Sequence, residues 1–87
     1  MKIRFYSPFN RICGSELDIE IEESITLKDL IYMLSLRYSE FEKYASKEDD
    51  EALWAHMLIV KNGASITLND YIDSNDKIDI LPFAAGG

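Results

Sequence analysis

The segment whose residue types best fit a chemical reaction is the end of the chain, Ala84-Ala85-Gly86-Gly87. Glycine has no Cβ, so two consecutive glycines form the thinnest peptide that can thread a narrow tunnel, whatever φ the tunnel requires. With glycine usage near ~7%, a chain ends in two glycines by chance about once in 200 cases. The four residues after Phe83 reach roughly 13 Å when extended. A terminal carboxylate is unreactive until a partner adenylates it, after which a sulfur or amine nucleophile can attack the acyl group. An inert, frayed end is the alternative interpretation.

The side chains offer no comparable reaction centre. His56 is the single histidine, and it precedes an apolar segment, where a structural role is more common than general-base catalysis. Cys13 is the single cysteine, and we expect a small buried residue there because a reactive thiol needs an accessible, electropositive setting. One cysteine excludes an intrachain disulfide and a cysteine-based zinc site. The sequence contains no glycine-rich phosphate loop and no H-E-x-x-H, so we expect no bound cofactor or metal and no autonomous enzyme.

Composition predicts one small domain. The chain has 87 residues, of which 47% are hydrophobic, and 9 basic against 16 acidic residues give a net charge of −7. This balance argues against nucleic acid or an anionic membrane as the main partner, and it favours a partner with a basic surface. No run of ~18 apolar residues and no signal-peptide pattern occurs, so we expect a cytoplasmic protein.

Apolar and polar residues alternate from residue 2 to 6 and again from 17 to 22, which predicts two strands that form an antiparallel hairpin. Pro8 cannot donate a hydrogen bond to a ladder, so the first strand is expected to end near Ser7. Residues 9–14 are then expected to be a loop.

The period changes to that of one helical face in a set of five apolar residues: Leu27, Leu30, Ile31, Leu34 and Tyr38. Thr26 and Asp29 have the spacing of a capping box, and Ile25 with Leu30 has the spacing of a hydrophobic staple. These features predict one helix of roughly 12 residues.

Residues 39–55 carry a weaker signal. Phe41 and Tyr44 would attach a short helical turn to the core. Residues 47–51 are all charged, and we expect a solvated loop there, because the run lacks the glycine and the alternating carboxylates of a calcium loop.

The last third of the chain predicts three strands. The apolar run 57–60 is followed by Asn62-Gly63, a strong hairpin signal because both residues tolerate positive φ, and a short strand at 65–68 should pair back.

Residues 72–76 have the composition of a turn, with Asn75 expected in the left-handed region. The final strand is predicted at 77–81, and Pro82 is expected to end it.

This order of elements predicts an α+β fold in which one main helix covers a mixed sheet of four or five strands. The crossover lets the last strand lie parallel to the first in the middle of the sheet, which is the β-grasp, or ubiquitin-like, arrangement. We expect residues 1–83 to form this domain and residues 84–87 a flexible tail. The expected core contains Ile3, Phe5, Leu17, Ile19, Leu30, Leu34, Ile59, Ile78 and Ile80.

The same arrangement predicts a docking surface. Tyr6 and Leu81 lie outside the predicted core face, on strands expected to be parallel neighbours, so they should meet at the base of the tail. Together with Phe83 they would seat a partner. Scattered surface hydrophobic residues are the alternative, since such residues are common.

The chain resembles the small subunits of molybdopterin synthase, within the ThiS/MoaD group of sulfur carriers, over essentially its whole length. The resemblance rests on five segments: Lys2-Ile3-Arg4-Phe5-Tyr6, Gly14, Val60-Lys61-Asn62-Gly63, residues 72–78, and Leu81-Pro82-Phe83-Ala84-Ala85-Gly86-Gly87. It differs from the family pattern at Asn75, where a glycine is usual, at Phe83, where a second proline is common, and within 39–55.

The resemblance implies that an activating enzyme uses ATP to adenylate Gly87, next to Gly86, and that Gly87 is converted to a thiocarboxylate. The tail would then insert into the large subunit of molybdopterin synthase, which places sulfur on a pterin precursor. The partner-binding residues implied are Tyr6, Leu81, Pro82, Phe83, Ala84 and Ala85.

Three other functions remain open. A sulfur carrier of thiamine biosynthesis has the same tail, but such carriers tend to lack much of what lies here between Tyr38 and Trp54. A ubiquitin-like modifier would join Gly87 to lysines of other proteins. A β-grasp interaction module with an inert tail is the third. What becomes attached to Gly87, sulfur or a lysine, distinguishes the first two chemistries.

Overall fold

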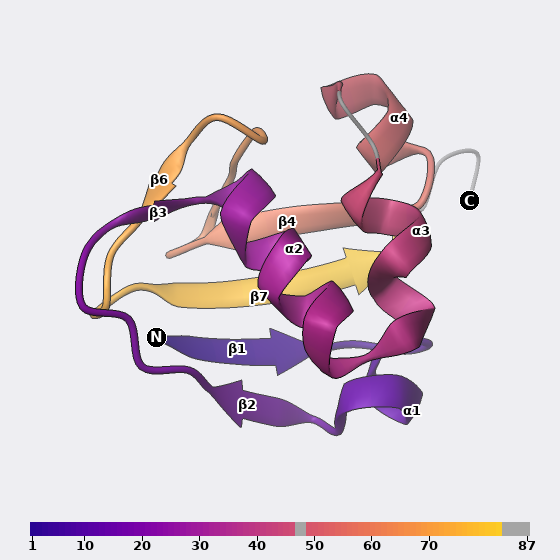
Figure 1. Cartoon of the computed structure of the whole chain (residues 1–87), viewed down its shortest axis with the longest axis horizontal. Coiled ribbons are helices and arrows are strands. Elements are labelled where there is room, and N and C mark those ends of the chain that lie inside the picture. Colours follow the sequence, from indigo (N-terminus) through magenta and orange to yellow (C-terminus); the bar gives the residue numbers. More distant parts are fainter. Residues whose placement is uncertain (47–48, 83–87) are drawn as a thin grey trace.

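The computed structural model describes residues 1–46 and 49–82 (Figure 1). A five-stranded sheet has the order β2-β1-β7-β4-β5, and a second, two-stranded sheet pairs β3 with β6. The strands are β1 (Lys2–Phe5), β2 (Glu16–Asp18), β3 (Ile25–Thr26), β4 (Met57–Lys61), β5 (Ala64–Ser65), β6 (Tyr71–Ile72) and β7 (Lys77–Pro82). The helices are α1 (Asn10–Cys13), α2 (Leu27–Arg37), α3 (Glu42–Ala45) and α4 (Asp50–Trp54), with a 3-10 turn η1 (Ser39–Phe41).

The layers are those of the predicted β-grasp fold. β1 pairs parallel with β7 and antiparallel with β2, and β4 pairs antiparallel with β7, so the sheet is mixed. Figure 1 shows α2 and α3 on one face of this sheet, with α2 crossing the central strands. No helix within 1–46 or 49–82 is long and apolar enough to cross a membrane.

The main helix begins as predicted. The Thr26 hydroxyl accepts a hydrogen bond from the Asp29 backbone N–H, and the Asp29 carboxylate accepts one from Thr26, each at 3.1 Å. This reciprocal capping box satisfies two donors that a helix start leaves unpaired. α2 then runs for 11 residues and packs Leu30 and Leu34 onto the sheet, both fully buried.

The second strand, β2, is shorter than the predicted range of residues 17–22. Leu17, one of the two core residues expected there, is less buried than predicted. Ile19 exchanges backbone hydrogen bonds with Met1, both at 3.0 Å, so the ladder ends where the chain begins and residues 20–22 have no partner. Because β2 is an edge strand, Leu17 has a neighbouring strand on one side only. Leu17 is half-buried, whereas the rest of the expected core is buried.

The expected loop at residues 9–14 contains α1 instead. β1 ends at Phe5 rather than near Ser7, because the Tyr6 carbonyl accepts hydrogen bonds from the N–H groups of Phe9 and Asn10 and so starts a turn. The turn inserts Phe9 into the core, where its ring centroid lies 6.1 Å from that of Phe41.

The segment 39–55 is more helical than predicted. Phe41 and Tyr44 do fix a helical turn on the core, as expected. Part of the charge run, however, begins α4: the Asp49 carboxylate accepts the Ala52 N–H at 2.7 Å and caps the helix. The expected solvated loop is therefore wrong for the acidic residues from Asp50 on, while residues 47 and 48 lie outside the described parts.

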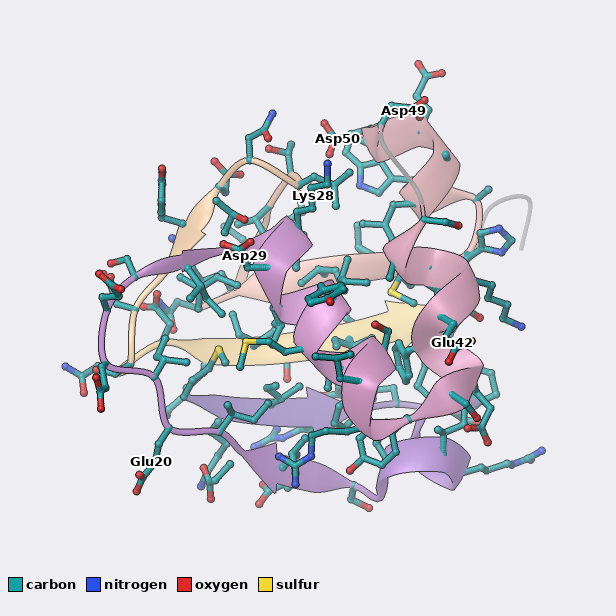
Figure 2. All side chains as sticks on the ribbon, in the orientation of Figure 1. Glu20, Lys28, Asp29, Glu42, Asp49 and Asp50 are labelled. Atoms are coloured by element: carbon teal, nitrogen blue, oxygen red, sulfur yellow. The ribbon has the colours of Figure 1, made fainter. Side chains whose placement is uncertain are left out.

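Asp50 also ties α4 to the rest of the fold. Its carboxylate accepts the Leu68 backbone N–H at 2.7 Å, and the Leu68 carbonyl accepts the Lys28 N–H at 3.1 Å. Figure 2 shows Lys28 extending from the first turn of α2 toward Asp50. The starts of α2 and α4 are thus both hydrogen-bonded to the backbone of Leu68, in the segment between β5 and β6.

The predicted hairpin is confirmed at Asn62-Gly63, with φ of 50° and 90°. Its return strand covers only Ala64–Ser65 rather than 65–68. Asp70 ends it, because the Asp70 carboxylate accepts the Thr67 N–H at 2.8 Å and so forms a turn.

The turn before β7, predicted at residues 72–76, differs from the prediction at Ile72 and at Asn75. Ile72 belongs to β6, where it pairs with Ile25 and is fully buried. Asn75 does not adopt a positive φ; among the described non-glycine residues, Asn62 alone does. The Asp76 carboxylate instead accepts the Asp73 N–H at 2.7 Å, which closes the turn without a left-handed residue. This hydrogen bond is the main cause of the lowered pKa of Asp76.

The buried face of α2 generates a stability prediction with an internal control. Leu34 is fully buried and Leu36, on the same helix, is 71% exposed. Leu34→Ala should lower the free energy of unfolding by about 2–5 kcal/mol because it leaves a cavity. Leu36→Ala should change it by less than about 0.5 kcal/mol. Urea denaturation of both variants measures the difference, and equal midpoints would contradict the core assignment.

Candidate functional site

β7 carries the chain to the predicted reactive end. Its last residue, Pro82, is exposed and pairs with Met57 at the start of β4. The predicted site residues Phe83, Ala84, Ala85, Gly86 and Gly87 lie outside the described residues. The part of the site that the structure describes is therefore the surface around the end of β7.

The predicted pair at this end is brought together. β1 and β7 run in register with Phe5 opposite Ile80, and the Tyr6 N–H donates to the Ile80 carbonyl at 3.0 Å. Tyr6 therefore follows its strand beside Leu81. The Tyr6 side chain is 38% exposed, whereas Leu81 is half-buried, so Leu81 is less available than the sequence suggested.

A third apolar residue completes this surface. Leu58 in β4 lies directly opposite Leu81 and is half-buried, while its neighbours Met57 and Ile59 are fully buried. Because side chains alternate along a strand, Leu58 must share the outer face with Leu81. Leu58 was not among the predicted site residues, although its place in the apolar run 57–60 indicates an outward-facing side chain. We call Tyr6, Leu58 and Leu81 the tail-proximal patch.

A permanent positive charge lies next to this patch. The pKa of the Arg4 guanidinium is raised, chiefly by the Tyr6 side chain and also by the negative charge of Asp79. The Arg4 Nε lies 3.9 Å from a Glu16 carboxylate oxygen, and both side chains are more than half exposed. Such an exposed pair contributes little to stability.

The surroundings of His56 and Cys13, the two side chains considered as alternative reaction centres, fit structural roles. His56 is exposed, with its ring centroid 5.4 Å from that of Tyr44. Cys13 is half-buried, and burial, followed by the charge of Glu40, raises the pKa of its thiol to about 11. A thiol with this pKa is protonated near neutral pH and is a poor nucleophile.

Metal binding finds no support in the described parts of the chain. Within 1–46 and 49–82, no group of three or more His, Cys, Asp or Glu side chains is placed to hold an ion. Of the acidic residues labelled in Figure 2, Glu20, Glu42 and Asp49 lie in well-separated parts of the structure.

Comparison with known proteins identifies a sequence family and a set of similar folds. Residues 3–87 match the model of the ThiS family. A solved structure of the HVO 2177 protein of Haloferax volcanii has a TM-score of 0.80 at 20% identity, covering 99% of this chain and 84% of that one. A Pyrococcus furiosus protein named for molybdopterin converting factor, subunit 1, has a TM-score of 0.74 at 24% identity over 93% of both chains. SAMP1 of Haloferax volcanii has a TM-score of 0.74 at 20% identity, covering 99% of this chain and 97% of that one.

No curated protein matches the chain by sequence. At identities of 24% or less, the similar structures establish a shared fold, while the family match rests on the sequence itself.

The raised pKa of Cys13 predicts slow alkylation. At pH 8 iodoacetamide should modify Cys13 in the folded chain at least about tenfold more slowly than in the urea-unfolded chain, because only about one thiol in a thousand is ionised. The rate should rise steadily as the pH approaches 11. Mass spectrometry of timed samples measures both rates, and equal rates in the folded and unfolded chains would contradict the assignment.

Proposed function

The chain belongs to the ThiS family, and we propose that it is a sulfur carrier that reacts through the carboxylate of Gly87, as the small subunit of a molybdopterin synthase. The observation that carries the proposal is the family match, which extends to Gly87 and includes the Gly-Gly end. The fold is consistent with this role, because the central strand β7 leads directly into that end.

The proposed reaction starts at the activating enzyme, which binds ATP. A Gly87 carboxylate oxygen attacks the α-phosphorus, pyrophosphate leaves, and an acyl-adenylate forms. A sulfur nucleophile, hydrosulfide in the simplest case, then attacks the carbonyl carbon and expels AMP, which leaves a thiocarboxylate. The carrier holds no cofactor in this scheme, and the proposed location of the reaction is the cytoplasm, which supplies ATP.

The tail-proximal patch is the proposed docking surface for the partners. The activating enzyme and the large subunit of molybdopterin synthase would each cover Tyr6, Leu58 and Leu81 while the tail, from Pro82 and Phe83 through Ala84, Ala85 and Gly86, enters the active site. Three large apolar side chains gathered at the end of β7 favour a protein–protein contact. The pterin precursor would receive the sulfur in the large subunit.

Protein modification is the second candidate function. It is favoured by the likeness to SAMP1, which shares the fold over nearly its whole length, and to a second crystal structure, that of small archaeal modifier protein 1 of Haloferax volcanii. The acyl-adenylate is the same in both reactions. A lysine amine in place of a sulfur nucleophile would expel AMP and leave an amide.

The tip of the tail decides between these chemistries. In protein recovered from its host, or after incubation with ATP, the activating enzyme and a sulfur source, intact-mass spectrometry should show one carboxylate oxygen of Gly87 replaced by sulfur. A branched peptide that ends in Gly87 on a lysine would instead establish the modifier function and contradict the sulfur-carrier proposal.

Variants locate the sulfur. Deletion of Gly87, or extension of the chain beyond it, should abolish the mass increase while circular dichroism remains unchanged. Cys13→Ser and His56→Ala should retain it, since neither side chain takes part. If folded Cys13→Ser accepts no sulfur, the carrier would be a persulfide on Cys13 and the proposal would be wrong.

Docking through the tail-proximal patch is tested separately. Leu81→Asp should weaken binding to the activating enzyme by at least ~2 kcal/mol, the range of a buried hot spot. Leu36→Asp introduces the same charge at an exposed leucine on the helical side and should leave the affinity nearly unchanged. Calorimetric titration of both folded variants decides the question: an unchanged dissociation constant for Leu81→Asp would mean that the tail docks alone.

A further inference from the structure

The outer face of the sheet contains a hollow that the chemistry at Gly87 does not use. It has a volume of about 270 Å³ and is lined by Lys2, Arg4, Lys77, Ile78 and Asp79. All five residues belong to the adjacent strands β1 and β7. In Figure 1 this face lies behind the sheet, on the side opposite α2 and α3.

Two lysines face each other in this hollow, and the carboxylate that lines it, Asp79, is the ladder partner of Arg4 rather than of either lysine. Lys2 and Lys77 are direct partners in the parallel β1–β7 ladder, and both are exposed. Like charges directly opposite each other on one face repel. Among the described residues the recorded ion pair is Arg4 with Glu16, so no carboxylate of these parts comes within ion-pair distance of either lysine. Asp18 is the partner of Lys2 in the β1–β2 ladder, but it too lies beyond ion-pair distance of Lys2.

The rest of the protein has the opposite charge. The net charge is −7, and Figure 2 shows Glu20 and Asp49 projecting from the periphery of the molecule. A partner with acidic groups would be repelled over most of the surface and attracted at this hollow. The hollow can therefore fix the orientation of such a partner, because charge complementarity governs specificity and encounter more than affinity.

The hollow is continuous with the tail-proximal patch. Lys2 and Tyr6 are four positions apart along one extended segment, about 13 Å at the rise of a β-strand. Both residues are exposed on the same face. A partner that covers Tyr6 and Leu81 with an interface of ordinary size extends over the hollow as well.

We propose that the hollow between Lys2 and Lys77 receives an acidic segment of the protein that docks on the tail-proximal patch, with a carboxylate of that segment between the two ammonium groups. The inference rests on the proposed function for the identity of the docking protein, the activating enzyme. It also revises the expectation of a basic partner surface, which followed from net charge alone.

Two double variants with the same change in net charge test the inference. Lys2→Glu/Lys77→Glu reverses the hollow, and Lys28→Glu/Lys43→Glu reverses two exposed cations on the helical side. Calorimetry against the activating enzyme at low and physiological salt should give at least about tenfold weaker binding and a smaller salt dependence for the first variant. The control should change the dissociation constant by less than about threefold. Equal effects of the two variants, or wild-type affinity of the first, would overturn the inference.

A second measurement separates this inference from the proposed function. If the wild-type chain does not bind the activating enzyme, the proposed function fails, and hexaglutamate then serves as the probe of the hollow. In ¹⁵N–¹H spectra hexaglutamate should shift the amides of β1 and β7 in the wild type and not in Lys2→Glu/Lys77→Glu. Absent shifts, or shifts equally large on α2 and α3, would overturn the acidic-segment site.

Discussion

The parallel pairing of β1 with β7 in the centre of the sheet is the constraint on which the rest of the structure depends. Its register sets Ile3 opposite Ile78 and Phe5 opposite Ile80, and these side chains are buried beneath the helices. The same register places the outward pairs, Lys2 with Lys77 and Tyr6 beside Leu81. A slip of one residue would exchange the two faces of the slipped strand, exposing its core residues and dispersing both the patch and the hollow.

In the proposed reaction the folded domain provides a docking surface, and no side chain of the domain needs to be reactive. The thiol of Cys13 is protonated near neutral pH, since burial raises its pKa to about 11, and His56 stands against an aromatic ring rather than a carboxylate. Reactivity is proposed at a backbone carboxylate, which becomes an electrophile only when a partner activates it. A stable sheet with a patch at the end of its central strand is therefore a sufficient carrier.

Features set by local sequence could be predicted, and features set by partners distant in the sequence could not. The capping box of Thr26 and the Asn62-Gly63 hairpin involve neighbouring residues, so their spacing revealed them. The end of β2 depends on where Met1 lies, and α4 is tied to the fold by the hydrogen bond between the Asp50 carboxylate and the Leu68 N–H, 18 residues apart. The Asp49 cap of α4 is local, but it lies in a charge run whose composition favours a solvated loop. The pairing of Lys2 with Lys77 in the ladder likewise exists only through register, which the sequence pattern did not specify. The residues from Phe83 to Gly87 lie outside the described parts, so their predicted role stays a prediction.

The central claim, that activation occurs at Gly87 and at no side chain, is tested most directly by ATP–pyrophosphate exchange. The activating enzyme, ATP and labelled pyrophosphate are mixed with the carrier, and formation of the acyl-adenylate is measured as label that enters ATP. The account predicts exchange with the wild-type chain and none with a chain that lacks Gly87, at equal concentration and with the same fold. Exchange that persists without Gly87 would contradict it.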